Sequence, residues 1–161
     1  MAENENDEGV IERNGVLATM AWIGPAKRFV LQRGAAYRFG IFALTPNRLA
    51  FATDDGVLLD EARANVAPKW PGILAGSGFW IKTPSASCAI HFRRPFTDAP
   101  LNSTVIKAVE ALDNISNLNL QAALGLSESD LNVHLRRATL ADNKWKGARA
   151  TTARVRAILE E

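Results

Sequence analysis

The stretch from Tyr37 to Val66 limits the possible folds most, because it holds three short apolar runs separated by two turn signals. Thr45-Pro46-Asn47 ends the first run, since proline presets the φ angle of a turn and cannot donate a hydrogen bond within a sheet. In the second run, Leu49 and Phe51 alternate with smaller or polar residues, which is the period of a half-buried strand. Asp54-Asp55-Gly56 then gives a tight-hairpin signal. We therefore expect three consecutive antiparallel strands.

Period-two patterns outside this meander predict further strands. In the last of them, Cys88 falls on the apolar face, where we expect it to pack in the core. His91 and Arg93 fall on the opposite face of the same strand, where we expect them to point outward. Seven strands are expected before the first helix, at residues 16–23, 29–32, 37–44, 48–53, 57–63, 79–83 and 86–93.

Beyond Pro95 the apolar residues recur at spacings of three and four, which predicts amphipathic helices. The first helix is expected to run from about Leu101 to Ile115, after a proline at residue 100 that suits a helix start. Its apolar stripe consists of Leu101, Val105, Ala108, Val109, Leu112 and Ile115. Two more stripes predict helices near the end of the chain: Leu131, Leu135 and Ala138, and then Trp145, Ala148, Thr152, Val155 and Leu159.

The central meander resembles that of GRAM and bacterial PH-like domains, which belong to the pleckstrin-homology-like superfold. The matching residues are Leu44, Thr45, Arg48, Leu49, Phe51 and Gly56. The resemblance covers roughly residues 15–117 and implies a mainly β fold with C-terminal α structure. In that fold, a seven-stranded antiparallel barrel is capped by one helix, here the segment 101–115. Residues 118–161 would form additional C-terminal helices, and residues 1–14 are expected to be a disordered acidic N-terminus.

Charge is distributed unevenly, although the whole chain has a formal net charge of only +2. Residues 1–13 carry five carboxylates and one arginine, while residues 134–161 carry seven cations and three carboxylates. The basic C-terminal segment suits an amphipathic helix on a protein or membrane surface. A role in nucleic-acid binding is disfavoured for this segment, because its cations are not confined to one helix face.

Cysteine and histidine are scarce, which argues against several site classes. Cys88 has no second cysteine with which to form an internal disulfide, and with only His91 and His134 it gives a poor zinc site. No nucleophile and base, and no acid and base pair, stands out by spacing, so we expect no enzyme activity, no catalytic residue, no metal and no cofactor. The acidic start is unlike a signal peptide, and no apolar run reaches about 20 residues. We expect a cytoplasmic protein, with peripheral membrane attachment left open.

These observations favour a noncatalytic protein-interaction (adaptor) module that also self-associates. The expected interface residues are Leu131, Leu135, Trp145, Val155 and Leu159. The alternative is a peripheral membrane adaptor that binds anionic lipid through its basic first loop and its basic C-terminal helix. The resemblance implies lipid contacts around the first two strands, and the cations in this region are Lys27, Arg28, Arg33 and Arg38.

Val109→Asp tests the expected capping helix. If Val109 packs against the sheet, the substitution places a charge in an apolar environment and should unfold the domain. Circular dichroism during thermal unfolding measures the effect, and an unchanged melting temperature would contradict this role of the segment 101–115.

Overall fold

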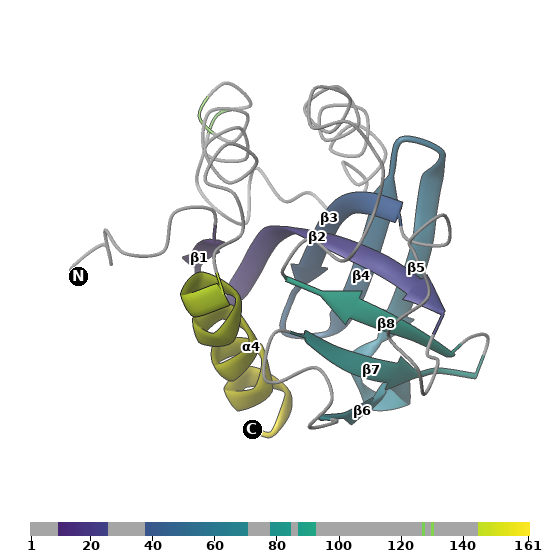
Figure 1. Cartoon of the computed structure of the whole chain (residues 1–161). Coiled ribbons are helices and arrows are strands. Elements are labelled where there is room, and N and C mark those ends of the chain that lie inside the picture. The colour runs from purple at the N-terminus through teal and green to yellow at the C-terminus, as the bar shows by residue number, and fades with distance from the viewer. Residues whose placement is uncertain are drawn as a thin grey trace.

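A computed structural model of the chain describes residues 10–25, 38–70, 78–84, 87–92, 127, 130 and 145–161 (Figure 1). The expected strand at 29–32 and the expected helix at 101–115 lie outside these residues. In chain order, the elements are β1 (Val10–Arg13), β2 (Val16–Pro25), β3 (Arg38–Leu44), β4 (Arg48–Thr53), β5 (Gly56–Ala62), the 3-10 turn η1 (Arg63–Asn65), β6 (Ala67–Lys69), β7 (Gly78–Lys82), β8 (Ser87–His91) and the helix α4 (Trp145–Leu159). The chain is thus mainly β with a C-terminal helix, as expected.

All the described strands belong to one antiparallel sheet, in which seven follow the order β5-β4-β3-β2-β8-β7-β6. The central strand is β2, and one of its edges pairs with β3 along most of its length. The other edge is shared, because β1 pairs with residues 16–19 and β8 pairs with residues 22–25. The path ends at β5 and β6, so the described strands do not close into the expected barrel.

The N-terminal hairpin corrects the expectation of disorder over residues 1–14. Val10–Arg13 form β1, which turns into β2 through Asn14 and Gly15. Both turn residues have positive φ, 55° and 77°. This is the geometry that asparagine and glycine tolerate best, and their sequence is a hairpin signal in its own right. Residues 1–9 lie outside the described part of the chain.

The meander expected at residues 37–66 is confirmed. Leu44 pairs with Leu49 across the β3–β4 turn, and Thr53 pairs with Gly56 across the β4–β5 turn. The register of the second hairpin shifts, because Phe51 pairs with Leu59 while its neighbour Ala52 pairs with Val57. Leu58 is therefore an extra residue on β5, which is the definition of a β-bulge.

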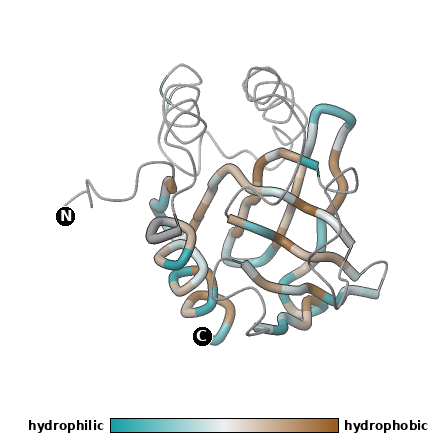
Figure 2. Tube along the Cα trace, in the orientation of Figure 1, coloured by the Kyte–Doolittle hydropathy of each residue, from teal (hydrophilic) through white to brown (hydrophobic). Residues whose placement is uncertain are grey.

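The sheet is strongly curled around the main core. The rings of Phe42 on β3 and Phe79 on β7 lie 6.0 Å apart, although β2 and β8 separate these strands in the sheet. In a flat sheet three strand spacings would place them about 14 Å apart. Figure 2 shows hydrophobic residues along most strands of this sheet. The cluster they form includes Leu17, Ile23, Phe42, Leu44, Leu49, Phe51, Leu59, Phe79, Ile81, Cys88, Ile90 and Phe92.

The helix α4 lies against β7 and belongs to the same core (Figure 1). Ala148, Val155 and Ile158 are members of the core cluster. Thr152 is also buried, and its hydroxyl donates a 2.8 Å hydrogen bond to the carbonyl oxygen of Ala148 one turn earlier. The apolar stripe expected for this helix is confirmed at residues 148, 152 and 155. Val155 is 0% exposed because it packs within its own chain, and the interface expected at this helix stays a prediction.

The central strands are buried on both faces, which the sequence did not indicate. The second face is formed by Val16, Ala18, Met20, Trp22, Phe39, Ile41, Ala43, Ala50, Ala52, Ala89 and His91, none of them more than 5% exposed. The expectation of a half-buried β4 is therefore wrong. Its alternation is between large and small apolar side chains, and alanine is readily buried.

Val155→Asp tests whether α4 is an integral part of the fold. The substitution puts a carboxylate into the core, and we expect it to lower the free energy of unfolding by about 3 kcal/mol or more. Ala153→Asp is the matched control, because this residue is exposed on the same helix and should change stability by less than about 1 kcal/mol. Urea unfolding measures the free energy of unfolding of both variants. Equal effects would show that the packing of Val155 in the core does not contribute to stability.

Candidate functional site

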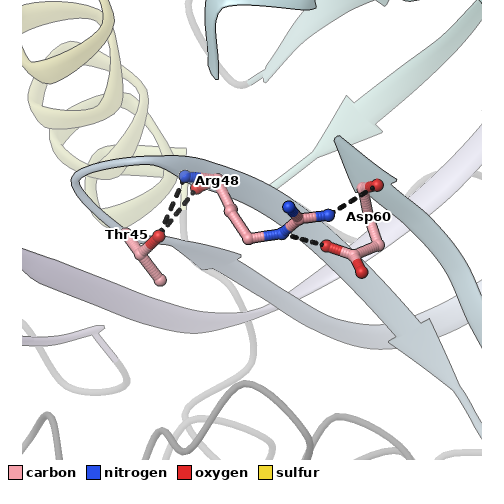
Figure 3. A network of polar contacts seen from close by, with 3 residues as sticks. All are labelled: Thr45, Arg48 and Asp60. Atoms are coloured by element: carbon pink, nitrogen blue, oxygen red, sulfur yellow. Dashed lines mark hydrogen bonds and ion pairs between the residues drawn. The ribbon is translucent and has the colours of Figure 1, made fainter. Parts of the chain in front are cut away.

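The β3–β4 turn is held by a polar network around Arg48 (Figure 3). The backbone N–H of Arg48 donates to the Thr45 hydroxyl at 2.9 Å, and the N–H of Thr45 donates to the Arg48 carbonyl at 2.8 Å. The Arg48 guanidinium reaches across to β5, where Nε donates to Oδ1 of Asp60 at 2.6 Å and Nη2 donates to the Asp60 carbonyl at 3.2 Å. The hydrogen bond to Asp60 raises the pKa of Arg48. Arg48 therefore has a structural role: its hydrogen bonds stabilise the β3–β4 turn and join it to β5.

Arg63 connects this turn to the end of α4. Its Nη1 donates to the carbonyl oxygens of Thr45 and Pro46, at 3.3 and 3.2 Å. Its Nη2 donates to the carbonyl of Ile158 at 2.6 Å. Carbonyls in the last turn of a helix lack partners within the helix, so a cation there is favourable both as a donor and as a charge. Arg63 is therefore a structural cation that joins the helix to the sheet.

Two arginines of the basic C-terminal segment are also engaged within the chain. Arg154 Nε donates to both carboxylate oxygens of Glu12 at 2.8 Å, with a further bond from Nη2, and this links α4 to β1. The hydrogen bond to Glu12 raises the pKa of Arg154. Arg156 pairs with Glu160 at 2.9 Å and lies 5.4 Å from the ring centre of Trp70. The expected lipid-binding face of this helix is thus partly occupied by internal contacts.

Most of the site residues expected from the sequence lie outside the described part of the chain, so their arrangement stays a prediction. Lys27, Arg28 and Arg33 lie outside the described residues. Arg38 begins β3 and forms an exposed ion pair with Asp55 of the β4–β5 turn, with a nitrogen–oxygen distance of 3.1 Å. The expected interface residues Leu131 and Leu135 also lie outside the described residues, as does the side chain of Trp145. Leu159 is partly buried and packs against the core.

His91 does not point into solvent as expected. It lies on the second face of the sheet, opposite Trp22 of β2, and is only 5% exposed. Burial lowers the pKa of His91 to about 4, so the ring is neutral at physiological pH. Cys88 is buried as expected, and burial raises the pKa of its thiol to about 11, which leaves little thiolate. Within the described residues, no three His, Cys, Asp or Glu side chains gather as a possible metal site.

The feature that sequence reasoning missed is an exposed apolar pair on β5. Val57 is 46% exposed and Leu58 is 40% exposed. They are the exposed large hydrophobic side chains among the described residues. Three apolar residues in a row cannot all face inward in a strand, and this was the available signal. The bulge at Leu58 turns two of them outward and leaves Leu59 in the core.

Comparisons of the chain with family models, with curated proteins and with solved structures find no match. Among the helices of the described residues, none has the length and apolar character needed to cross a membrane.

The burial of His91 predicts a specific pH dependence of stability. Its pKa in the folded protein is below the ordinary value of 6.5, so unfolding takes up a proton between pH 6.5 and pH 4. Stability should therefore fall as the pH drops from 7 to 5, by about 2 kcal/mol from this group alone.

Urea unfolding of the wild-type chain and His91→Phe at both pH values isolates this contribution. The carboxylates and His134 are common to both proteins, so their titration cancels in the difference. Parallel pH profiles for the two proteins would contradict a neutral, buried His91.

Proposed function

We propose that this chain is a noncatalytic protein-interaction module of the PH/GRAM-like type. What supports the fold assignment is the antiparallel succession of strands β2 to β8 in a curled sheet, followed by a helix that packs on the core. What supports the interaction role is the exposed pair Val57 and Leu58, in a chain whose other described large apolar side chains are buried or partly buried. Adjacent exposed hydrophobic residues on a regular element are typical of a docking surface.

The partner that this surface fits is a second copy of the chain. Near Val57, Asp55 of the β4–β5 turn pairs with Arg38 at the start of β3, and these two side chains are both more than half exposed and of opposite charge. In a two-fold symmetric dimer the same patch meets itself, so Arg38 of one copy can face Asp55 of the other while the apolar side chains pack between them. A patch with charges of both signs is self-complementary in this sense.

The contact should be made by side chains and not by sheet extension. An edge strand can add a further strand only if its outer hydrogen-bonding groups are accessible and regular. On β5, the bulge at Leu58 and the charged Asp60 and Glu61 interrupt that edge. At the other end of the sheet, β6 has three residues, one of which is Pro68. Both sheet ends are therefore poor templates for another strand.

Leu58→Glu should convert the self-associated protein to monomers. The substitution adds a charge to each side of the contact, and like charges would meet across the two-fold axis. Light scattering over a range of protein concentrations measures the mass in solution. Because Leu58 is on the surface, the folded state should be retained, with a change in stability below about 1 kcal/mol.

Ala153→Glu is the matched control, since it adds the same charge at an exposed position on α4. It should leave the mass unchanged. A wild-type protein that is monomeric at all concentrations would remove self-association, and dimers that survive Leu58→Glu would remove this surface as the contact.

A further inference from the structure

One half of the sheet is made from a segment without acidic residues. Residues 62–97 contain Arg63, Lys69, Lys82, Arg93 and Arg94, and no aspartate or glutamate. This segment supplies β6, β7 and β8, whereas the carboxylates of Asp55, Asp60 and Glu61 belong to the β4–β5 side. No carboxylate within the segment therefore offsets the charge of its cations.

Two lysines and a tryptophan share the outer face of β6 and β7. Phe79 and Ile81 of β7 point into the core, so the alternating Trp80 and Lys82 lie on the opposite face. Lys69 of β6 is the cross-strand partner of Trp80. Lys82 follows two residues after Trp80 and is thus the diagonal neighbour of Lys69, about 7 Å away across the strand pair.

The surroundings leave these groups available. Lys69 and Lys82 are exposed, and neither forms an ion pair within the described residues. The residues opposite Lys82 on the two neighbouring strands are Ala67, which is small, and Ser87, an exposed hydroxyl. Two ammonium groups at diagonal positions and a hydroxyl form a set of donors for phosphate oxygens.

Trp80 decides between the possible polyanions. It is partly buried, so part of its indole is covered by the protein and part is accessible. The described exposed large hydrophobic residues, Val57 and Leu58, belong to β5, so the described residues of β6 and β7 include no exposed large apolar side chain of the kind that enters a bilayer. An aromatic ring set in a sheet between cations is instead the arrangement on which single-stranded nucleic acids stack their bases.

We propose that the outer face of β6 and β7 binds single-stranded nucleic acid without sequence preference. One base stacks on Trp80, and neighbouring phosphates contact Lys69 and Lys82, with Ser87 as an additional donor. This site is separate from the Val57 and Leu58 surface, so it does not depend on the proposed self-association.

Fluorescence anisotropy of a labelled oligothymidylate of about 15 nucleotides tests this with the full-length chain. We expect saturable binding at about 50 mM salt, weakened by about 5- to 150-fold in Trp80→Ala through loss of stacking. Lys69→Gln and Lys82→Gln should each reduce the slope of log affinity against log salt by about 0.7. Arg149→Gln, at an exposed position on α4, is the matched control and should leave affinity unchanged.

Circular dichroism of each variant verifies that the fold is retained. Absence of saturable oligonucleotide binding by the wild-type chain overturns the proposal, and so does binding that the three variants leave unchanged. Vesicles containing phosphatidylserine form a separate arm. One outcome is that the vesicles bind and the oligonucleotide does not. If Lys69→Gln and Trp80→Ala then weaken vesicle binding, the site binds a membrane surface and not a nucleic acid.

Discussion

The pairing of β2 with three other strands is the constraint on which the rest of this structure depends. One edge of β2 carries β3, and the other is divided between β1 and β8. Without this division, the β3–β5 meander and the β6–β8 strands would be two separate sheets, each with one apolar face open to water. Because they share β2, the sheet can curl until Phe42 and Phe79 touch, and one core serves both halves.

Local turn chemistry explains why part of this fold was predictable. Pro46, and the Asp-Gly pair at residues 55–56, fixed the hairpins of the meander, and the spacing of Ala148, Thr152 and Val155 predicted the buried side of α4. The Asn14–Gly15 signal was equally local and was overlooked, because the acidic composition before it suggested disorder. Where a residue's conformation depends on its immediate neighbours, the sequence was sufficient.

Burial that depends on distant elements was not predictable in the same way. In the alternating pattern of β8, His91 faces away from Cys88 and Ile90, and it would be exposed if only one face of the sheet were covered. It is buried because both faces of the sheet are covered at this position. The run Val57-Leu58-Leu59 signals that some of these residues face outward, but the register shift against β4 that leaves Val57 and Leu58 exposed depends on the pairing of the two strands. The sequence pattern indicated that the cations of α4 form a free basic surface. In the structure, however, Arg154 donates hydrogen bonds to Glu12, which belongs to a strand near the opposite end of the sequence. The segment 101–115 and the basic residues 27, 28 and 33 stay predictions.

The shared edge of β2 also has a consequence for how the chain acquires its structure. The β1–β2, β3–β4 and β4–β5 hairpins join neighbouring segments and can form early, since their loops are short. The pairing of Trp22 with His91 closes a long loop that contains five other strands. Closing this loop has a large entropic cost, so we expect β8 to pair with β2 after the hairpins have formed. Until that step is complete, part of β2, an apolar strand, has one unpaired side. We therefore expect the interval before β8 arrives to be when newly made chains are most prone to aggregate.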